Sequence, residues 1–173
     1  MANGRIKGKV FERNIARDLL QACRKGGLNV SPVDCFRTPL SGGHVFASKK
    51  DPGDLQLSQI ILDHLPILVE CKCYREVHLE RFLGSPRGPE FKWLDQVIRA
   101  AEGTGRTPIL VMKGNNRGIY VVLPMKEFSF LNGIFGYITF YYQKEWWYVI
   151  RWEVFLVDHV SYKIQQELNG GKQ

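Results

Sequence analysis

Residues 66–74, PILVECKCY, form an apolar run that carries two opposite charges, and this run constrains the fold more than any other part of the chain. Its Ile, Leu, Val and Cys content predicts a strand that is buried on both faces. Side chains of a strand alternate between two faces, so one face holds Ile67, Val69, Cys71 and Cys73, and the other holds Leu68, Glu70, Lys72 and Tyr74. Burying Glu70 and Lys72 costs free energy unless they are paired or bind a metal ion. That cost indicates a functional site.

Asp54, which follows Gly53 in a turn, is the second carboxylate of this predicted site, and fifteen residues separate it from Glu70. Two carboxylates bind Mg2+ through oxygen and leave several water positions open. Asp54, Glu70 and the Cys71 carbonyl could supply the protein ligands. Lys72 would orient a water that attacks a phosphodiester and would stabilise the developing charge. The pattern predicts phosphodiester hydrolysis; the alternative is a Glu70–Lys72 ion pair that only holds the sheet.

Positive charge is concentrated at the start of the chain. Residues 1–50 hold ten Lys and Arg against three Asp and Glu, whereas residues 51–173 hold fourteen of each. A basic segment beside a metal site suits a polyanion, because neutralising phosphates releases counterions. The alternative is a solvated basic face without a partner.

A chain of 173 residues fits one compact domain that needs no disulfide or structural metal. The four cysteines, at positions 23, 35, 71 and 73, lack the paired spacing of zinc sites and are expected to be reduced. There is no apolar N-terminal signal and no run of eighteen apolar residues. We therefore expect a soluble, cytoplasmic protein of a bacterial, archaeal or virus-infected host cell, with no membrane partner.

Residues 9–24 place Phe11, Ile15, Leu19 and Cys23 at fourfold spacing, which predicts an amphipathic helix that ends at Gly26 and Gly27. Glu12 lies one step from this apolar row and is a candidate third carboxylate. The alternative role for Glu12 is an exposed first-turn residue that stabilises the helix dipole.

The remaining apolar runs, bounded by turn residues, predict strands over residues 28–37, 54–62, 66–74, 108–113 and 118–124. A helix is predicted over residues 90–102, and its Gln96 could point towards the site. The loop over residues 38–43 could bind phosphate through its glycine amides, Ser41 and Arg37. This order of elements describes an α/β sheet flanked by helices.

Aromatic residues gather in the tail, because residues 125–173 carry thirteen of the 21 aromatics of the chain. Segments 134–142 and 146–157 are predicted strands of a hairpin that turns at residues 143–145. Three roles compete for this hairpin: an extension of the core sheet, an aromatic subunit interface, and a surface on which unpaired bases stack.

Four segments in this order and spacing resemble the archaeal-type Holliday junction resolvases, a branch of the PD-(D/E)xK nucleases. The segments are 7–13 (KGKVFER), 36–43 (FRTPLSGG), 53–55 (GDL) and 69–72 (VECK). The resemblance covers about residues 5–124. It implies a restriction-endonuclease-like central mixed sheet flanked by helices over residues 1–124. The aromatic hairpin of residues 125–173 is then an extension packed on the same domain.

The resemblance also implies roles for individual residues. Asp54 and Glu70 correspond to the metal-binding carboxylates, Lys72 to the catalytic lysine, Glu12 to a helix-borne glutamate that completes the site, and Ser41 to a loop serine associated with catalysis. Arg13 and Arg37 match DNA-contacting residues, and we assign Lys7, Lys9, Lys49 and Lys50 to nucleic-acid binding with them. Such enzymes are homodimers that use Mg2+, for which Mn2+ is expected to substitute, and nick opposed strands of four-way DNA junctions. No small-molecule cofactor is implied.

Two features depart from this family. Its usual proline before the first aspartate is Gly53 here, and an alternative register through Pro52 would make Asp51 the ligand. We favour Asp54, because Leu55 and Leu57 follow it with the alternation of a strand, whereas Asp51 follows two lysines. The tail after residue 124 does not map onto the family.

Two other functions remain open on the sequence. One is a PD-(D/E)xK endonuclease of restriction or repair type, and the other is a DNA-binding module without catalysis. The histidines lack ligand spacing and none is assigned to metal, and the chain has no HNH pattern, which argues against a nuclease that uses a histidine base.

Overall fold

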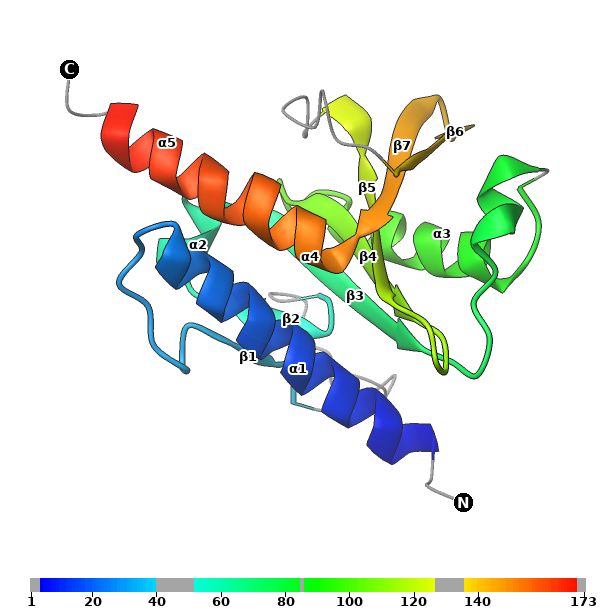
Figure 1. The fold of residues 1–173 in the computed structure, drawn as a ribbon, viewed down its shortest axis with the longest axis horizontal. Helices are drawn as coiled ribbons and strands as arrows, with labels where there is room; N and C mark the ends of the chain where they lie inside the picture. The colour runs from blue at the N-terminus through cyan, green and yellow to red at the C-terminus, as the bar shows by residue number, and fades with distance from the viewer. Residues whose placement is uncertain (1–3, 40–51, 85, 127–135, 171–173) are drawn as a thin grey trace.

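The computed structural model describes residues 4–39, 52–84, 86–126 and 136–170, and a mixed five-stranded sheet lies at its centre (Figure 1). The strands follow the order β3-β4-β5-β7-β6, in which only β3 and β4 are parallel neighbours. Their bounds are β3 Ile67–Cys73, β4 Thr107–Lys113, β5 Ile119–Pro124, β6 Ile138–Tyr142 and β7 Glu145–Arg151. The expected α/β fold, with a mixed sheet flanked by helices, is confirmed.

Helices cover both faces of the sheet. On one face lie α1 (Gly4–Lys25) and a C-terminal helical stretch made of α4 (Trp152–Val154), the π-helix η3 (Phe155–Ser161) and α5 (Tyr162–Gly170). On the other face lie the short helix η1 (Leu79–Leu83) and α3 (Pro89–Ala101). The alternation predicted for β3 is confirmed. Ile67, Val69 and Cys71 pack in the apolar cluster under α1 and the C-terminal helices, whereas Leu68 packs in the cluster under η1 and α3.

The predicted N-terminal helix forms and begins earlier than expected, at Gly4. Its row of fourfold-spaced apolar side chains is buried under the sheet. The helix ends before Gly27, whose φ of +106° favours glycine. At Gly26, an added Cβ would lie 2.8 Å from the Ile164 Cβ, so a glycine is needed where α1 and α5 meet.

Two predicted strands are shorter than expected. Residues 28–34 are not a strand, because Asp34 accepts hydrogen bonds from the amide and hydroxyl of Ser31 and holds the chain in a turn; only β1 (Cys35–Arg37) is extended. It pairs antiparallel with β2 (Leu55–Leu57) in a separate two-stranded sheet. The prediction for residues 54–62 is wrong after Ser58, where α2 (Gln59–Leu62) begins and buries Ile61.

The C-terminal hairpin extends the core sheet, the first of its three predicted roles, because β7 pairs with β5 and β6 pairs with β7. Gln143 and Lys144 turn the chain with φ of 51° and 64°, as tight hairpin turns require. The predicted strand over 146–157 is wrong beyond Arg151. There the chain becomes helical and buries Trp152, Phe155 and Val160 against the face that α1 covers.

The predicted helix over residues 90–102 is confirmed within a residue as α3. The predicted strands 108–113 and 118–124 are confirmed within a residue as β4 and β5, which form an antiparallel pair around the turn at Asn116. Among the described residues, no helix combines the length and the apolar composition needed to cross a bilayer.

Candidate active site

Asp54 lies against the open side of β3, which is the edge strand of the five-stranded sheet. The Asp54 amide donates to the Val69 carbonyl at 2.8 Å, and its Oδ2 accepts from the Cys71 amide at 2.8 Å. The N–H and C=O of one strand residue point to the same side, so the Cys71 carbonyl also points towards this edge. Asp54 and the Cys71 carbonyl therefore lie where one cation could bind both.

Gly53 permits this close approach. Its φ is +115°, and an added Cβ would lie 3.0 Å from the Val69 carbonyl oxygen and 3.2 Å from Leu68 Cδ2. Proline, whose ring fixes φ near −65°, cannot adopt this conformation. The departure from the resolvase pattern at this position thus has a local structural reason. Asp51, the ligand in the alternative register, lies outside the described residues.

Glu70 and Lys72 are neighbours on one face, as their alternation predicted, with Lys72 Nζ 2.5 Å from Glu70 Oε1. This ion pair is also what the purely structural alternative predicted. Gln96 Nε2, on α3, donates to the same oxygen at 2.7 Å, so the expectation that Gln96 points towards the site is confirmed. Two donors on one oxygen fix the Glu70 carboxylate between β3 and α3, where both hydrogen bonds are partly buried.

Glu12 is buried at the same edge although it lies on α1. Its Oε2 accepts from Arg37 Nε at 2.5 Å, which joins α1 to β1. The Thr38 amide donates to the Asp54 carbonyl at 2.8 Å and joins β1 to the turn before β2. The site therefore collects side chains from five separate segments: α1, β1, the turn at Asp54, β3 and α3.

The electrostatics of the site favour a cation. The pKa of the Asp54 carboxyl rises from 3.8 to about 7, first because it is buried and then because Glu70 is negative; the Cys71 amide and Lys72 oppose the rise, and Glu12 adds to it. Burial lowers the pKa of Lys72, but Glu70 and Asp54 outweigh burial and the net shift is upwards. Lys72 therefore stays protonated.

The donor set fits Mg2+ or Mn2+, because carboxylate and carbonyl oxygens suit hard divalent ions. Within the described residues, no group of three or more His, Cys, Asp or Glu side chains is placed to hold a metal ion. Two carboxylates at an edge instead match an ion that keeps several waters, as Mg2+ usually does in sites where it meets phosphates.

The basic residues assigned to nucleic-acid binding lie in different surroundings. Lys7, Lys9 and Arg13 are exposed on α1. Burial raises the pKa of the Cys73 thiol, and the charges of Lys113 and Lys7 oppose this, so both lysines lie near the end of β3. Ser41, Lys49 and Lys50 lie outside the described residues.

The histidines within the described residues contact groups other than Asp54 and Glu70. His64 contacts Glu167 on α5 at 2.8 Å, and His78 lies among glutamates of the 75–90 segment. His159 is buried beside Phe155, and burial lowers its pKa to about 3, so it is neutral at physiological pH.

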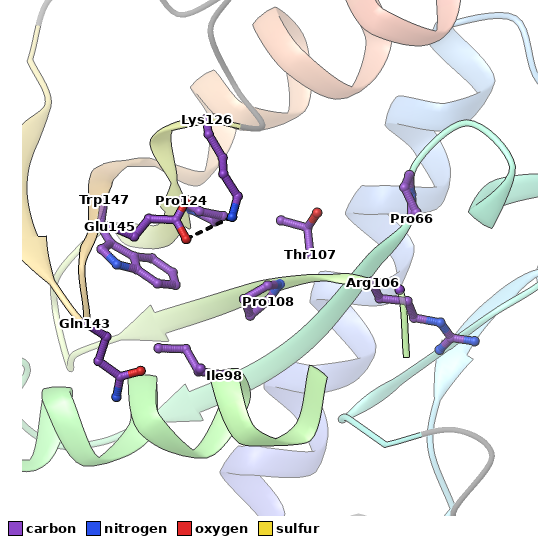
Figure 2. A pocket seen from close by; sticks show the side chains of 11 residues that line it. Pro66, Ile98, Arg106, Thr107, Pro108, Pro124, Lys126, Gln143, Glu145 and Trp147 are labelled. Carbon is purple, nitrogen blue, oxygen red and sulfur yellow. Dashed lines mark hydrogen bonds and ion pairs between the residues drawn. The ribbon is translucent and has the colours of Figure 1, made fainter. Parts of the chain in front are cut away.

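A cavity of about 390 Å³ lies at the other end of the sheet (Figure 2). Its walls include Pro66 and Thr107, at the starts of β3 and β4, and an ion pair of 3.1 Å between Lys126 and Glu145. Asp54 and Glu70 do not line it. This cavity and the candidate active site are therefore separate.

A protein-family model described as "Phage putative PDDEXK endonuclease" matches residues 3–166. The chain belongs to this family. The nuclease superfamily expected from the motifs is thereby confirmed at the coarser level of a PD-(D/E)xK endonuclease. The match runs through β6, β7 and most of α5, so the tail that does not map onto the archaeal resolvases is covered by this family's model. Searches of curated proteins and of solved structures found no match.

Sequence reasoning missed two groups near β3. Tyr74 stacks on Trp93 of α3, and Arg81 pairs with the buried Glu90. The first was within reach, because Tyr74 was placed on the face of Glu70 and Lys72, and Trp93 precedes Gln96 by one helical turn. The second depends on how the irregular 75–89 segment folds, for which the sequence carries no periodic pattern.

Proposed function

We propose that this PD-(D/E)xK family member is a metal-dependent endonuclease that acts on branched DNA, with four-way junctions as its foremost substrate. The observation that carries the proposal is that buried Asp54, which accepts from the Cys71 amide of β3, interacts electrostatically with the Glu70–Lys72 pair of the same strand. Buried carboxylates that repel one another would also repel a DNA phosphate unless a cation joined them. A binding module without catalysis gains nothing from this arrangement.

Asp54, Glu70 and the Cys71 carbonyl would hold the ion, with Glu12 completing the site. The ion would be Mg2+, with Mn2+ as a substitute. When bound, a divalent cation lowers the pKa of water and neutralises charge on the attacked phosphate. The raised pKa of Asp54 supports this role, because a second positive charge would return Asp54 to its ionised form.

Lys72 supplies the fixed positive charge of the proposed reaction. Its ammonium has three donors, of which Glu70 takes one in the described geometry. The others can orient the attacking water and stabilise charge that develops on the phosphate oxygens. Gln96 donates to the Glu70 carboxylate from α3. This bond would keep Glu70 in place while Lys72 contacts the water and the phosphate.

DNA binding would involve the exposed basic residues Lys7, Lys9 and Arg13 of α1, together with Arg37, Ser41, Lys49 and Lys50. A homodimer with two equivalent sites suits two equivalent strands of a junction, because a C2 axis relates both. Each monomer alone would make single nicks.

The test compares a labelled four-way junction with a linear duplex of the same sequence during a Mg2+ titration, with product ends mapped on all four strands. Paired nicks in opposed strands, absent without the metal, are the expected result. Equal cutting of the duplex would instead support a restriction or repair type of endonuclease. A wild-type protein that binds DNA yet never cuts with Mg2+ or Mn2+ would support a binding module.

Asp54→Asn and Glu70→Gln should abolish cutting and retain junction binding. Glu145→Gln is the matched control, because this carboxylate pairs with Lys126 at the other end of the sheet. Its cutting rate should equal that of the wild type.

A further inference from the structure

Tyr74 forms an exposed aromatic platform beside the candidate active site. It directly follows β3 and stacks on Trp93 of α3, with ring centroids 4.6 Å apart and an interplanar angle of 21°. Tyr74 is 49% exposed, whereas Trp93 is 9% exposed. Trp93 thus supports the tyrosine ring from the core side, and much of the tyrosine surface remains open to solvent.

The Tyr74 ring lies on the same face of the β3 strand as Glu70 and Lys72, further along the chain. Glu70, Lys72 and Tyr74 alternate onto one face of the same strand, and a strand rises about 3.3 Å per residue, so the Tyr74 Cα lies about 7 Å beyond that of Lys72. The Tyr74 amide still donates to the Lys113 carbonyl at 3.0 Å, which keeps this residue in strand geometry. A displacement of about 7 Å is close to the length of one extended nucleotide.

The same helix supports both parts. Trp93 and Gln96 lie one turn apart on α3, and each contacts the β3 face, Trp93 through Tyr74 and Gln96 through Glu70. Lys72, two residues before Tyr74 on the same face of β3, supplies positive charge beside the ring. Lys7 and Lys113 add positive charge near Cys73, on the opposite face of the same strand end. A rigid ring with the Lys72 ammonium on the same face meets the two requirements for binding a single-stranded nucleotide: a stacking surface and phosphate neutralisation.

We propose that the exposed face of Tyr74 stacks on an unpaired base of a nucleotide next to the cut phosphate. The inference rests on the proposed nuclease function and gives its selectivity a physical basis. A base inside a continuous duplex is covered by its neighbours and must be unstacked, whereas a base at a branch, flap or bulge is already available. The enzyme would therefore favour DNA with an interrupted stack beside the cut.

The proposal is tested with DNA that carries 2-aminopurine in place of the unpaired base at the branch, in Ca2+ so that binding is seen without cutting. Stacking on an aromatic ring quenches this fluorophore. Wild type and Tyr74→Phe should quench it, and Tyr74→Ala should not. The affinity of Tyr74→Ala for the branched DNA should fall about 5- to 100-fold, the range for losing one base–aromatic stack, while duplex affinity changes less than about twofold.

Two further variants separate stacking from folding. Tyr74→Leu keeps an apolar cover over Trp93 and lacks a π face, so it should bind branched DNA as weakly as Tyr74→Ala. Tyr141→Ala is the matched control, because Tyr141 is an exposed aromatic residue on β6, at the opposite edge of the sheet. It should behave as wild type.

Persistent quenching in Tyr74→Leu, or an equal loss of branched and duplex affinity in Tyr74→Leu, would overturn the proposal. Its failure is distinct from failure of the nuclease assignment. A wild type that cuts DNA without quenching would refute the stack alone, whereas a wild type that quenches but never cuts with Mg2+ or Mn2+ would refute the nuclease.

Discussion

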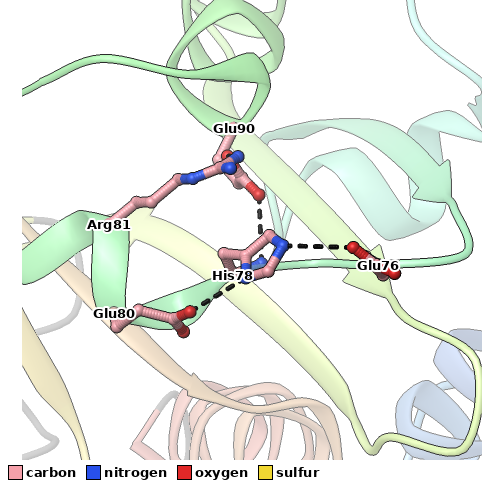
Figure 3. A network of polar contacts seen from close by, with 5 residues as sticks. All are labelled: Glu76, His78, Glu80, Arg81 and Glu90. Carbon is pink, nitrogen blue, oxygen red and sulfur yellow. Dashed lines mark hydrogen bonds and ion pairs between the residues drawn. The ribbon is translucent and has the colours of Figure 1, made fainter.

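Two buried carboxylates at opposite ends of one segment, Asp54 beside β3 and Glu90 on α3, show how differently a protein can treat a buried charge. Glu90 is fully buried, yet both of its oxygens are served: Oε1 accepts from the His78 amide at 3.0 Å and Oε2 from Arg81 Nη1 at 2.7 Å (Figure 3). It also lies in the first turn of α3, where the helix dipole favours a negative charge.

Asp54 has less compensation. One of its oxygens accepts from the Cys71 amide, and the nearest charges include two further carboxylates, Glu70 and Glu12. The hydrogen bonds of the buried Glu90 therefore connect His78 and Arg81 to α3. The buried Asp54 would instead be stabilised in its ionised form by an added positive charge. The contrast indicates that uncompensated burial, rather than burial itself, distinguishes the candidate active site.

The largest expected effect comes from removing one charge in each region. Glu70→Gln should lower the cleavage rate at least about 1,000-fold, or about 4 kcal/mol of activation free energy, because the cation loses a ligand. Glu90→Gln should leave the rate per folded molecule within about twofold. Single-turnover cleavage at saturating enzyme measures both. Equal losses in the two variants would erase the distinction between the regions.

The pH dependence of stability is the next effect. Because the pKa of Asp54 is raised to about 7 from 3.8, the folded protein binds this proton more tightly than the unfolded chain. The resulting stability is fully present below pH 3.8 and is lost as pH rises to about 7, by at most about 4 kcal/mol. The difference between metal-free wild type and Asp54→Asn in urea unfolding should show this loss. Saturating Mg2+ should restore wild-type stability at pH 8; a pH-independent difference would contradict the account.

Glu90→Ala should lower the free energy of unfolding by about 2–3 kcal/mol, because Arg81 and the His78 amide lose their acceptor. Chemical denaturation measures the change. Arg81 is partly exposed and can regain water, which keeps the cost below that of a fully buried pair. An unchanged midpoint would show that the 75–89 segment is held by its apolar contacts alone.

A pair of glycines gives the smallest and best-matched test. Gly53 and Gly88 have φ of +115° and +121°, and an added Cβ would lie 3.0 Å from the Val69 carbonyl oxygen or 3.1 Å from Arg81 Cδ respectively. Alanine at either position should cost about 1–2 kcal/mol of stability. Only Gly53→Ala should also slow cleavage, because it moves Asp54 away from β3. Rates measured at a temperature where both variants are folded decide the matter.

Most helices and strands could be predicted from the strong periodicity of their apolar residues. The row Phe11, Ile15 and Leu19 predicted α1, and the apolar run over 66–74 predicted β3 with Glu70 and Lys72 as neighbours on one face. Errors arose where local interactions override composition. The Ser31–Asp34 hydrogen bonds replace a strand, and residues after Arg151 have strand-like composition but helical spacing of their buried members.

The candidate site was predictable where one element supplies several of its parts, as β3 does for Glu70, Cys71 and Lys72. Contacts between distant segments were harder. The Glu12–Arg37 ion pair depends on how β1 and α1 meet, and Gly53 supports Asp54 through a positive φ that no pattern of side chains reveals. Gln96 was placed correctly because α3 had a clear apolar face.

Calorimetric titration of wild type and Asp54→Asn with Mn2+ at pH 7, in buffers of different ionisation enthalpy, tests the central claim most directly. The account predicts saturable binding by the wild type with release of the Asp54 proton, and an affinity at least about tenfold lower without proton release in Asp54→Asn. Equal binding by both proteins, or no saturable binding by the wild type, would contradict the claim that these buried carboxylates hold a divalent cation.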